Sequence, residues 1–116
     1  MKIGHKKKNN ILVITPEMPS LDALAAPLFK EQVFDLIKND EKPFVVVDLT
    51  NLTAIDTSGL GSFLALLRHL NTCGGSLKIS CMNRPVRTMF ELVSMHKIFD
   101  IFNTTEEAVS DFDKKQ

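Results

Sequence analysis

The sequence predicts an α/β domain with a largely parallel sheet and helical crossovers. Short apolar runs rich in β-branched residues, the clearest being Phe44–Leu49, alternate with segments whose apolar residues recur at helical spacing. Strands that alternate with helices are typical of parallel sheets, because each parallel connection needs a long crossover. At 116 residues the chain is expected to form one domain, spanning residues 1–116.

The first half of the chain predicts two strands and one helix. We expect a strand over 11–15 and a loop over 16–20. A helix should then begin near Pro27, because proline is tolerated at the first helical position. Its buried stripe comprises Phe29, Val33, Leu36 and Ile37. A turn over 39–43 leads to the strand at Phe44–Leu49, and a connection follows over 51–55.

The second half predicts three helices and two strands. A helix runs from about Ser58 to Thr72 and ends at Gly74-Gly75, as a C-cap would. A strand follows over 76–81. Arg84-Pro85 opens a third helix, whose Val86, Met89, Phe90 and Val93 fall at i, i+3, i+4 and i+7. A strand over 98–102 precedes a capping box at 104–107, which opens a last helix with Ala108, Val109 and Phe112. Residues 113–116 remain as a tail.

Composition and charge exclude several function classes. Apolar residues make up 44%, charged residues 24%, and the net charge is zero, so no global field attracts nucleic acid. Residues 2–8 are basic, but the apolar run at 11–14 is too short for a secretory signal core of roughly 7 to 15 residues. No stretch approaches the roughly 20 apolar residues of a membrane helix. We expect a cytoplasmic protein in which Cys73 and Cys81 are free thiols.

No cofactor site is predicted. The two cysteines and the three scattered histidines, His5, His69 and His96, make no metal-binding pattern. There is also no phosphate-binding glycine loop and no dinucleotide fingerprint. We therefore expect neither a metal nor another cofactor.

The stretch Asp56–Gly61 places a hydroxyl at the hinge between an apolar strand and an amphipathic helix. Ser58 is expected at or next to the N-terminus of that helix, where backbone N–H groups are unpaired and the dipole favours negative charge. A phosphoryl group on Ser58 would be well accommodated there. Gly59 and Gly61 should leave the N–H groups uncovered and let a partner approach closely. The alternative is that Ser58 is an ordinary N-cap.

Asp56-Thr57-Ser58-Gly59-Leu60 resembles the D-[ST]-[ST]-G-L signature of STAS domains, and in particular of the bacterial anti-sigma factor antagonists. The resemblance extends to Ser20–Ala23 leading to Ala26–Leu28, to Val45–Leu49, to Gly74-Gly75 and to Arg84–Val86. It implies a mixed, mostly parallel sheet of four to five strands with four helices packed on it. It also implies a first strand within residues 1–10, whereas the residues alone leave this segment as either a short strand or a mobile basic end.

The function that the resemblance implies is a phosphorylation-switched regulator. The unphosphorylated protein would bind an ATP-using serine kinase that is also the anti-sigma factor, and so free the sigma factor. Phosphorylation of Ser58 by that kinase would end the binding, and a metal-dependent serine phosphatase would restore it. Matching family positions place Asp22, Asp48 and Asp56 around the hydroxyl, although each carboxylate could instead satisfy loop N–H groups.

Within this motif we expect Ser58 to carry the phosphate, with Thr57 as the second choice. Ser58 is one residue nearer the free N–H groups, its side chain is unbranched, and it occupies the motif's second hydroxyl position. Thr57 is expected to support the turn through a local side-chain hydrogen bond. The partner-facing surface is predicted to comprise Thr57, Ser58, Gly59, Gly61 and Ser62.

Catalysis by this chain is not expected. Ser58 lacks the glycine two residues earlier that marks the nucleophile elbow of hydrolases, and His69 lies about three turns further along the same helix. A second hypothesis is a non-switching accessory subunit, resembling the STAS subunits of lipid-transporting ABC ATPases. The serine that follows Asp56-Thr57 favours the switched regulator.

Overall fold

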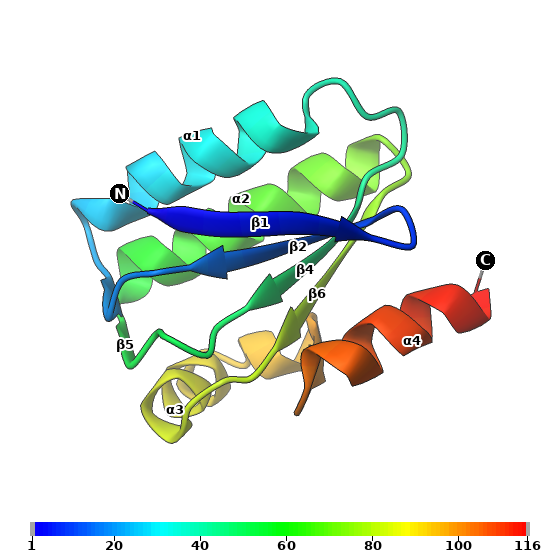
Figure 1. The fold of residues 1–116 in the computed structure, drawn as a ribbon. Helices are drawn as coiled ribbons and strands as arrows, with labels where there is room; N and C mark the ends of the chain where they lie inside the picture. The colour runs from blue at the N-terminus through cyan, green and yellow to red at the C-terminus, as the bar shows by residue number, and fades with distance from the viewer. Residues whose placement is uncertain (1, 116) are drawn as a thin grey trace.

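A mixed sheet of five strands, in the order β1-β2-β4-β6-β7, organises the computed structural model, which describes residues 2–115 (Figure 1). The strands are β1 (Ile3–Lys8), β2 (Ile11–Pro16), β4 (Phe44–Asp48), β6 (Ser76–Ser80) and β7 (Asp100–Phe102). β1 runs antiparallel to β2, and the other neighbouring pairs are parallel. The predicted α/β class with a mixed, mostly parallel sheet is confirmed.

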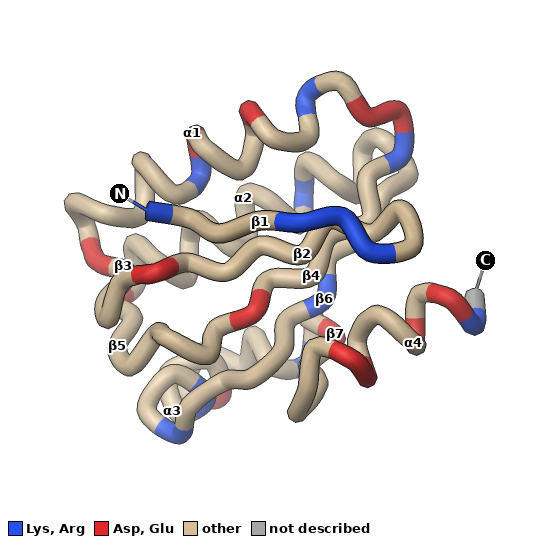
Figure 2. The backbone as a smooth tube through the Cα atoms, in the orientation of Figure 1, with Lys and Arg blue, Asp and Glu red and all other residues tan. Residues whose placement is uncertain are grey.

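The Lys-rich segment before Ile11 is a strand and not a mobile end. Asn9 and Asn10 have φ angles of 55° and 66°, which is typical of the tight two-residue turn of a hairpin. Figure 2 shows the basic run at the end of β1, where Lys6–Lys8 are exposed on the sheet edge. Lysines on an edge strand discourage pairing with a strand of another chain. This run therefore has a structural role that requires no ligand.

Within residues 2–115, four α-helices cover the two faces of the sheet. They are α1 (Ala25–Ile37), α2 (Thr57–Thr72), α3 (Arg84–Leu92) and α4 (Thr105–Lys115). α1, α2 and α3 pack on a large apolar cluster that includes Leu12 and Ile14, whereas α4 packs on a smaller one that includes Ile11 and Val13. Successive residues of β2 thus face opposite layers, as strand geometry requires. Figure 1 shows α1 and α2 on one side of the sheet and α4 on the other.

Phe63 of α2 lies at the centre of the larger cluster. Its ring is 5.5 Å from that of Phe29, 5.8 Å from that of Phe90 and 6.4 Å from that of Phe99, measured between centroids. Such ring pairs contribute about 0.5–1.5 kcal/mol each beyond the buried area. α2 is therefore held rigidly against the core, and whatever its first turn presents to solvent is held in place with it.

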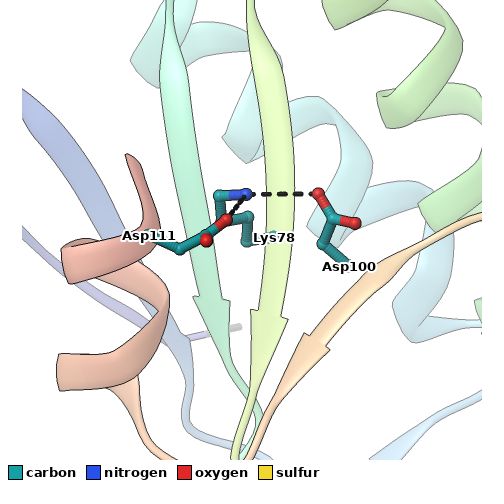
Figure 3. Close-up of polar contacts among 3 residues, drawn as sticks. All are labelled: Lys78, Asp100 and Asp111. Atoms are coloured by element: carbon teal, nitrogen blue, oxygen red, sulfur yellow. Dashed lines mark hydrogen bonds and ion pairs between the residues drawn. The ribbon is translucent and has the colours of Figure 1, made fainter. Parts of the chain in front are cut away.

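Lys78 connects the sheet to α4 on the second face (Figure 3). Its side chain is 1% exposed, and its Nζ lies 2.7 Å from Asp111 Oδ2 and 3.1 Å from Asp100 Oδ2. The ammonium also lies 4.5 Å from the centroid of the Phe112 ring. Because Asp100 belongs to β7 and Asp111 to α4, one buried cation joins three elements.

The start of α1 corrects the sequence prediction. The helix begins at Ala25 and not near Pro27, which lies in its first turn. Asp22 accepts hydrogen bonds from the backbone N–H groups of Leu24 (3.1 Å) and Ala25 (3.0 Å). Proline is tolerated throughout a first turn, because none of those N–H groups has a partner inside the helix. Pro27 therefore correctly indicated a helix start in this region but is not the first residue of the helix.

The end of α3 differs from the prediction in two ways. Val93 was assigned to the buried stripe but is 47% exposed, because the helix ends at Leu92 and Ser94 turns the chain with a φ of 60°. A 3-10 helix, η1 (Met95–Lys97), then occupies the approach to β7, so the strand begins at Asp100 and not at Ile98.

The last helix begins as predicted but runs further. The Thr104 N–H donates to Glu107 Oε1 and the Glu107 N–H donates to Thr104 Oγ1, both at 3.1 Å, which confirms the capping box. α4 continues to Lys115 through most of the predicted tail, and Gln116 lies outside the described residues.

Candidate functional site

A two-stranded parallel sheet that the sequence did not reveal brings two distant loops together. It pairs β3 (Ser20–Leu21) with β5 (Ala54–Ile55). The Pro19 carbonyl also accepts from the N–H groups of Thr53 (2.8 Å) and Ala54 (3.0 Å). Because β3 precedes α1 and β5 precedes α2, this pairing places the first turns of the two helices side by side.

Asp56, and not Ser58, is the N-cap of α2. The Asp56 carboxylate accepts a hydrogen bond of 3.1 Å from the Gly59 N–H, and its backbone is extended, as at a cap. Ser58 is consequently the second residue of the helix, and the alternative that it caps the helix is wrong. Ser58 is exposed, and its hydroxyl has no hydrogen bond to any residue in the described range 2–115. The hydroxyl is thus free for an external group.

Gly59 is buried and serves packing, which corrects its predicted role as an open approach. A Cβ at this position would lie 2.4 Å from the Leu21 carbonyl oxygen and 2.6 Å from Ile55 Cγ1. Its N–H is already bonded to Asp56. Only glycine therefore lets the first turn of α2 lie against the β3–β5 pair, and a partner does not reach this residue.

Gly61 and Ser62 have opposite surroundings. Ser62 is only 5% exposed, and its hydroxyl donates to the Gly59 carbonyl at 2.6 Å, so its predicted place on the partner-facing surface is wrong. Gly61 is exposed, and a Cβ there would meet no atom within 4 Å. Gly61 therefore remains a candidate for partner contact.

Thr57 is exposed beside Ser58. The local hydrogen bond expected for its hydroxyl is not present among the described residues. Capping by Asp56 explains this, because it already supplies the side-chain acceptor for the turn. Thr57 and Ser58 thus both present free hydroxyls, and the preference for Ser58 stays a prediction.

Asp22 and Asp56 lie close to this surface. Both line one depression of about 180 Å³ formed by the β3–β5 pair and the first residues after it. Each also satisfies backbone N–H groups, Asp22 those at the start of α1 and Asp56 that of Gly59. The two roles considered for these carboxylates, satisfying backbone N–H groups and lying around the Ser58 hydroxyl, are therefore compatible. The hydrogen bonds to the backbone hold each carboxylate in place at the edge of the candidate site.

Asp48 belongs to a different neighbourhood. One carboxylate oxygen accepts from the Thr50 N–H at 2.9 Å, and the other accepts from the Thr105 hydroxyl at 3.1 Å. Burial raises the pKa of Asp48, but hydrogen bonds from Thr50, Thr105 and Cys81 outweigh burial and hold the pKa below its usual 3.8. These contacts tie β4 to the start of α4, so they support a structural role for Asp48.

Asp48→Asn is expected to lower the free energy of unfolding by about 1 kcal/mol at neutral pH, through loss of charge-assisted hydrogen bonds at a half-buried site. The folded-state pKa is lowered, so the carboxylate stabilises the fold above its usual pKa of 3.8 and loses this effect as pH falls through the folded-state value. Urea unfolding should therefore show a difference in the free energy of unfolding between the wild type and Asp48→Asn, and this difference should become smaller below about pH 4. If Asp48→Asn had wild-type stability but was phosphorylated on Ser58 more slowly, Asp48 would have to be counted among the residues of the phosphorylation site.

An exposed apolar surface, missed from the sequence, adjoins the carboxylates. Leu24 is 84% exposed and Leu28 49% exposed. Together with Met18 and Asp22 they line a depression of about 300 Å³ at the start of α1. The available signal was that Leu24 and Leu28 lie outside the predicted buried stripe. Large exposed apolar side chains beside a polar site are typical of protein–protein contacts.

The surface around Ser58 is nearly free of charge on its own helix. α2 has no charged residue before Arg68, and Figure 2 shows its first turns without charge colouring. A second depression of about 180 Å³ separates Ser58 and Gly61 on α2 from Ala23, Pro27 and Lys30. A phosphoryl group on Ser58 would therefore change the charge of this surface strongly.

Two negative findings complete the description. Among the described residues, no group of three or more His, Cys, Asp or Glu side chains could hold a metal ion. None of the helices in that part of the chain has the length and apolar character that a membrane crossing requires.

Known proteins share both the sequence pattern and the fold. A family model described as STAS domain matches residues 2–108. An anti-sigma F factor antagonist of Paenibacillus polymyxa is 26% identical over 93 residues, which are 80% of this chain and 80% of that protein. The anti-sigma-B factor antagonist of Bacillus subtilis is 25% identical over 89 residues, which are 77% of this chain and 80% of that protein.

Solved structures extend the likeness to three dimensions. The anti-sigma factor antagonist SpoIIAA in its unphosphorylated form superposes with a TM-score of 0.82 at 19% identity, covering 97% of both chains. The phosphorylated form of SpoIIAA from Bacillus superposes with a TM-score of 0.72 at 19% identity, covering 96% of this chain and 99% of that one. At this identity the superpositions concern the fold.

Proposed function

This chain belongs to the STAS domain family, and we propose that it acts as an anti-sigma factor antagonist switched by phosphorylation of Ser58. In its unphosphorylated form it binds an ATP-using serine kinase that is also the anti-sigma factor, and the sigma factor is released. Phosphorylation of Ser58 in the cytoplasm ends this binding. A metal-dependent serine phosphatase removes the group and restores the antagonist.

The observation that carries the proposal is the exposed hydroxyl of Ser58. It lies in the first turn of a helix anchored by a buried aromatic core, and it forms no hydrogen bond within residues 2–115. A kinase can reach such a hydroxyl without unfolding any element. The helix dipole at the first turn of α2 favours the added negative charge.

Relatives and solved structures support this proposal. Two relatives that match more than three quarters of this chain are named as anti-sigma factor antagonists. SpoIIAA, which shares the fold, has been solved in both an unphosphorylated and a phosphorylated form. In this proposal the chain is the substrate of phosphoryl transfer and its partner is the catalyst.

The direct test is capture of the partner from the native host, followed by identification of partner and phosphopeptides by mass spectrometry. The captured kinase and ATP should phosphorylate Ser58, and Ser58→Ala should accept no phosphate while Thr57→Ala remains a substrate. If Ser58→Ala were still a full substrate of the kinase and carried its phosphate on Thr57, the modified residue would be Thr57 and not Ser58. A captured ABC ATPase whose binding ignores phosphorylation would favour the accessory-subunit hypothesis.

Gly61→Arg is expected to lower affinity for the partner at least about tenfold, or about 1.4 kcal/mol. The bulky side chain would project from an exposed position with no neighbouring atom within 4 Å, so the melting temperature should not fall. Titration calorimetry and thermal melting measure the two effects. Asn71→Arg, at the exposed far end of the same helix, is the matched control and should bind normally. Full binding by Gly61→Arg would place the interface elsewhere.

Leu24→Ser is expected to weaken partner binding by about tenfold, because burying a leucine side chain in an interface contributes about 1.5–3 kcal/mol. Leu24 is 84% exposed, so the substitution removes no core packing and the melting temperature should be unchanged. The control is Leu92→Ser at the end of α3, where the side chain is 72% exposed. If Leu92→Ser loses affinity and Leu24→Ser does not, the partner binds at α3.

A further inference from the structure

The depression between the first turns of α1 and α2 contains a single ionisable side chain. Its lining consists of Ala23, Ala26, Pro27, Lys30, Ser58, Gly61 and Ser62, around a volume of about 180 Å³. Ala26, Pro27 and Lys30 lie in the first two turns of α1, and Ser58, Gly61 and Ser62 lie in the first two turns of α2. Small residues on both walls leave the space, and Lys30 is the only charge that faces it.

The ammonium of Lys30 is unpaired in the unmodified protein. Its side chain is half-buried, and no described residue forms an ion pair or hydrogen bond with it. Two other lysines differ: Lys38 at the end of the same helix lies 3.9 Å from Asp35, and Lys78 is held by two carboxylates. A cation without a partner, lining the same depression as a free hydroxyl, is matched in charge to an anion carried by that hydroxyl.

We propose that Lys30 is the intramolecular receptor of the phosphoryl group on Ser58: its ammonium pairs with the phosphate across this depression and joins α1 to α2 in the modified state. The inference rests on the proposed phosphorylation of Ser58 and adds a residue that recognises the modification. No covalent step is involved beyond the kinase reaction. The pair would hold the phosphate at a fixed place on the surface, over the depression.

The pairing of Lys30 with the phosphate can be measured through the second pKa of the phosphoserine. A phosphoserine has a second pKa of about 6, and a nearby ammonium favours the dianion and lowers that pKa. Asp22 and Asp56, which line the neighbouring depression, act in the opposite sense. They are present in every variant below, so a difference between variants reports the Lys30 ammonium alone.

The test uses full-length protein carrying phosphoserine at position 58, incorporated during translation so that no partner kinase is needed. Phosphorus NMR titration of this protein, of its K30Q variant and of its K30R variant measures the phosphate pKa. We expect the pKa in K30Q to lie at least about 0.5 units above that of the parent, and K30R to stay near the parent. The difference should shrink in about 0.5 M salt, because the site is open to solvent.

Lys38→Gln is the matched control, since it removes the same charge from the end of α1, beyond the depression. Its phosphate pKa should equal that of the parent. Equal values in the parent and K30Q would overturn the pairing, as would an equal rise in K38Q. Because phosphoserine is incorporated during translation and no partner kinase is used, this result is independent of the proposed function, which fails separately if the captured kinase does not modify Ser58.

Discussion

Ser58→Asp is expected to weaken binding of the partner kinase by about 100-fold, or about 3 kcal/mol, and to leave the fold intact. A fixed negative charge would enter a surface of α2 that has no charged residue before Arg68, and unmatched charge at an interface costs several kcal/mol. In the free protein, a carboxylate in the first turn of a helix changes stability by only about 0.3–1 kcal/mol. Calorimetric titration and thermal melting separate the two effects.

Two controls make this result specific. Ser58→Asn, a neutral side chain of similar size to Asp, should retain most of the affinity. Ser110→Asp adds the same charge at an exposed position of α4, on the opposite face of the sheet, and should bind as the wild type does. Equal affinity of Ser58→Asp and wild type would contradict the switch, and loss in Ser110→Asp would indicate a general charge effect.

Lys78→Ala is expected to lower the free energy of unfolding by about 3 kcal/mol, at the lower end of the range for breaking a buried pair. The side chain is 1% exposed, and its removal takes away the ammonium that pairs with Asp100 and Asp111 and lies over the Phe112 ring. The cost stays at the lower end because Asp100 and Asp111 are 57% and 29% exposed and can recover water. A fall in melting temperature of about 10 °C should accompany it.

Lys78→Met preserves volume without charge and should recover part of this loss, because the aliphatic stem still fills the space under α4. Lys38→Ala is the control for an exposed lysine, 64% exposed beside Asp35, and should cost less than about 0.5 kcal/mol. Urea unfolding measures all three variants. A Lys78→Ala protein of wild-type stability would show that α4 is held by its apolar contacts alone.

The candidate site was only partly predictable. The motif Asp56–Gly61 indicated a modifiable hydroxyl at the start of a helix, and the structure places Ser58 there, exposed. It also separates residues that the motif groups together: Ser62 and Gly59 face inward and Gly61 faces outward. A sequence motif gives spacing, whereas orientation depends on the face that the helix turns to its core, and that face was set by Phe63 and its ring partners.

By itself, the sequence determined the order of four strands (β2, β4, β6 and β7) and of the four helices between and after them, the glycine end of α2 and the capping box of α4, because each follows from periodicity or from contacts within a few residues. Only the tertiary structure decided what depends on distant neighbours. The β3–β5 pair joins residues more than thirty positions apart in the chain, and the periodicity of a short sequence segment cannot predict a contact over that separation. Lys78 alternates with the apolar residues Leu77 and Ile79 in the sequence, and only the structure shows that α4 covers it and supplies Asp111. The physical reason is the same in both cases: local propensity sets which elements form, and the packing of those elements sets which side chains meet.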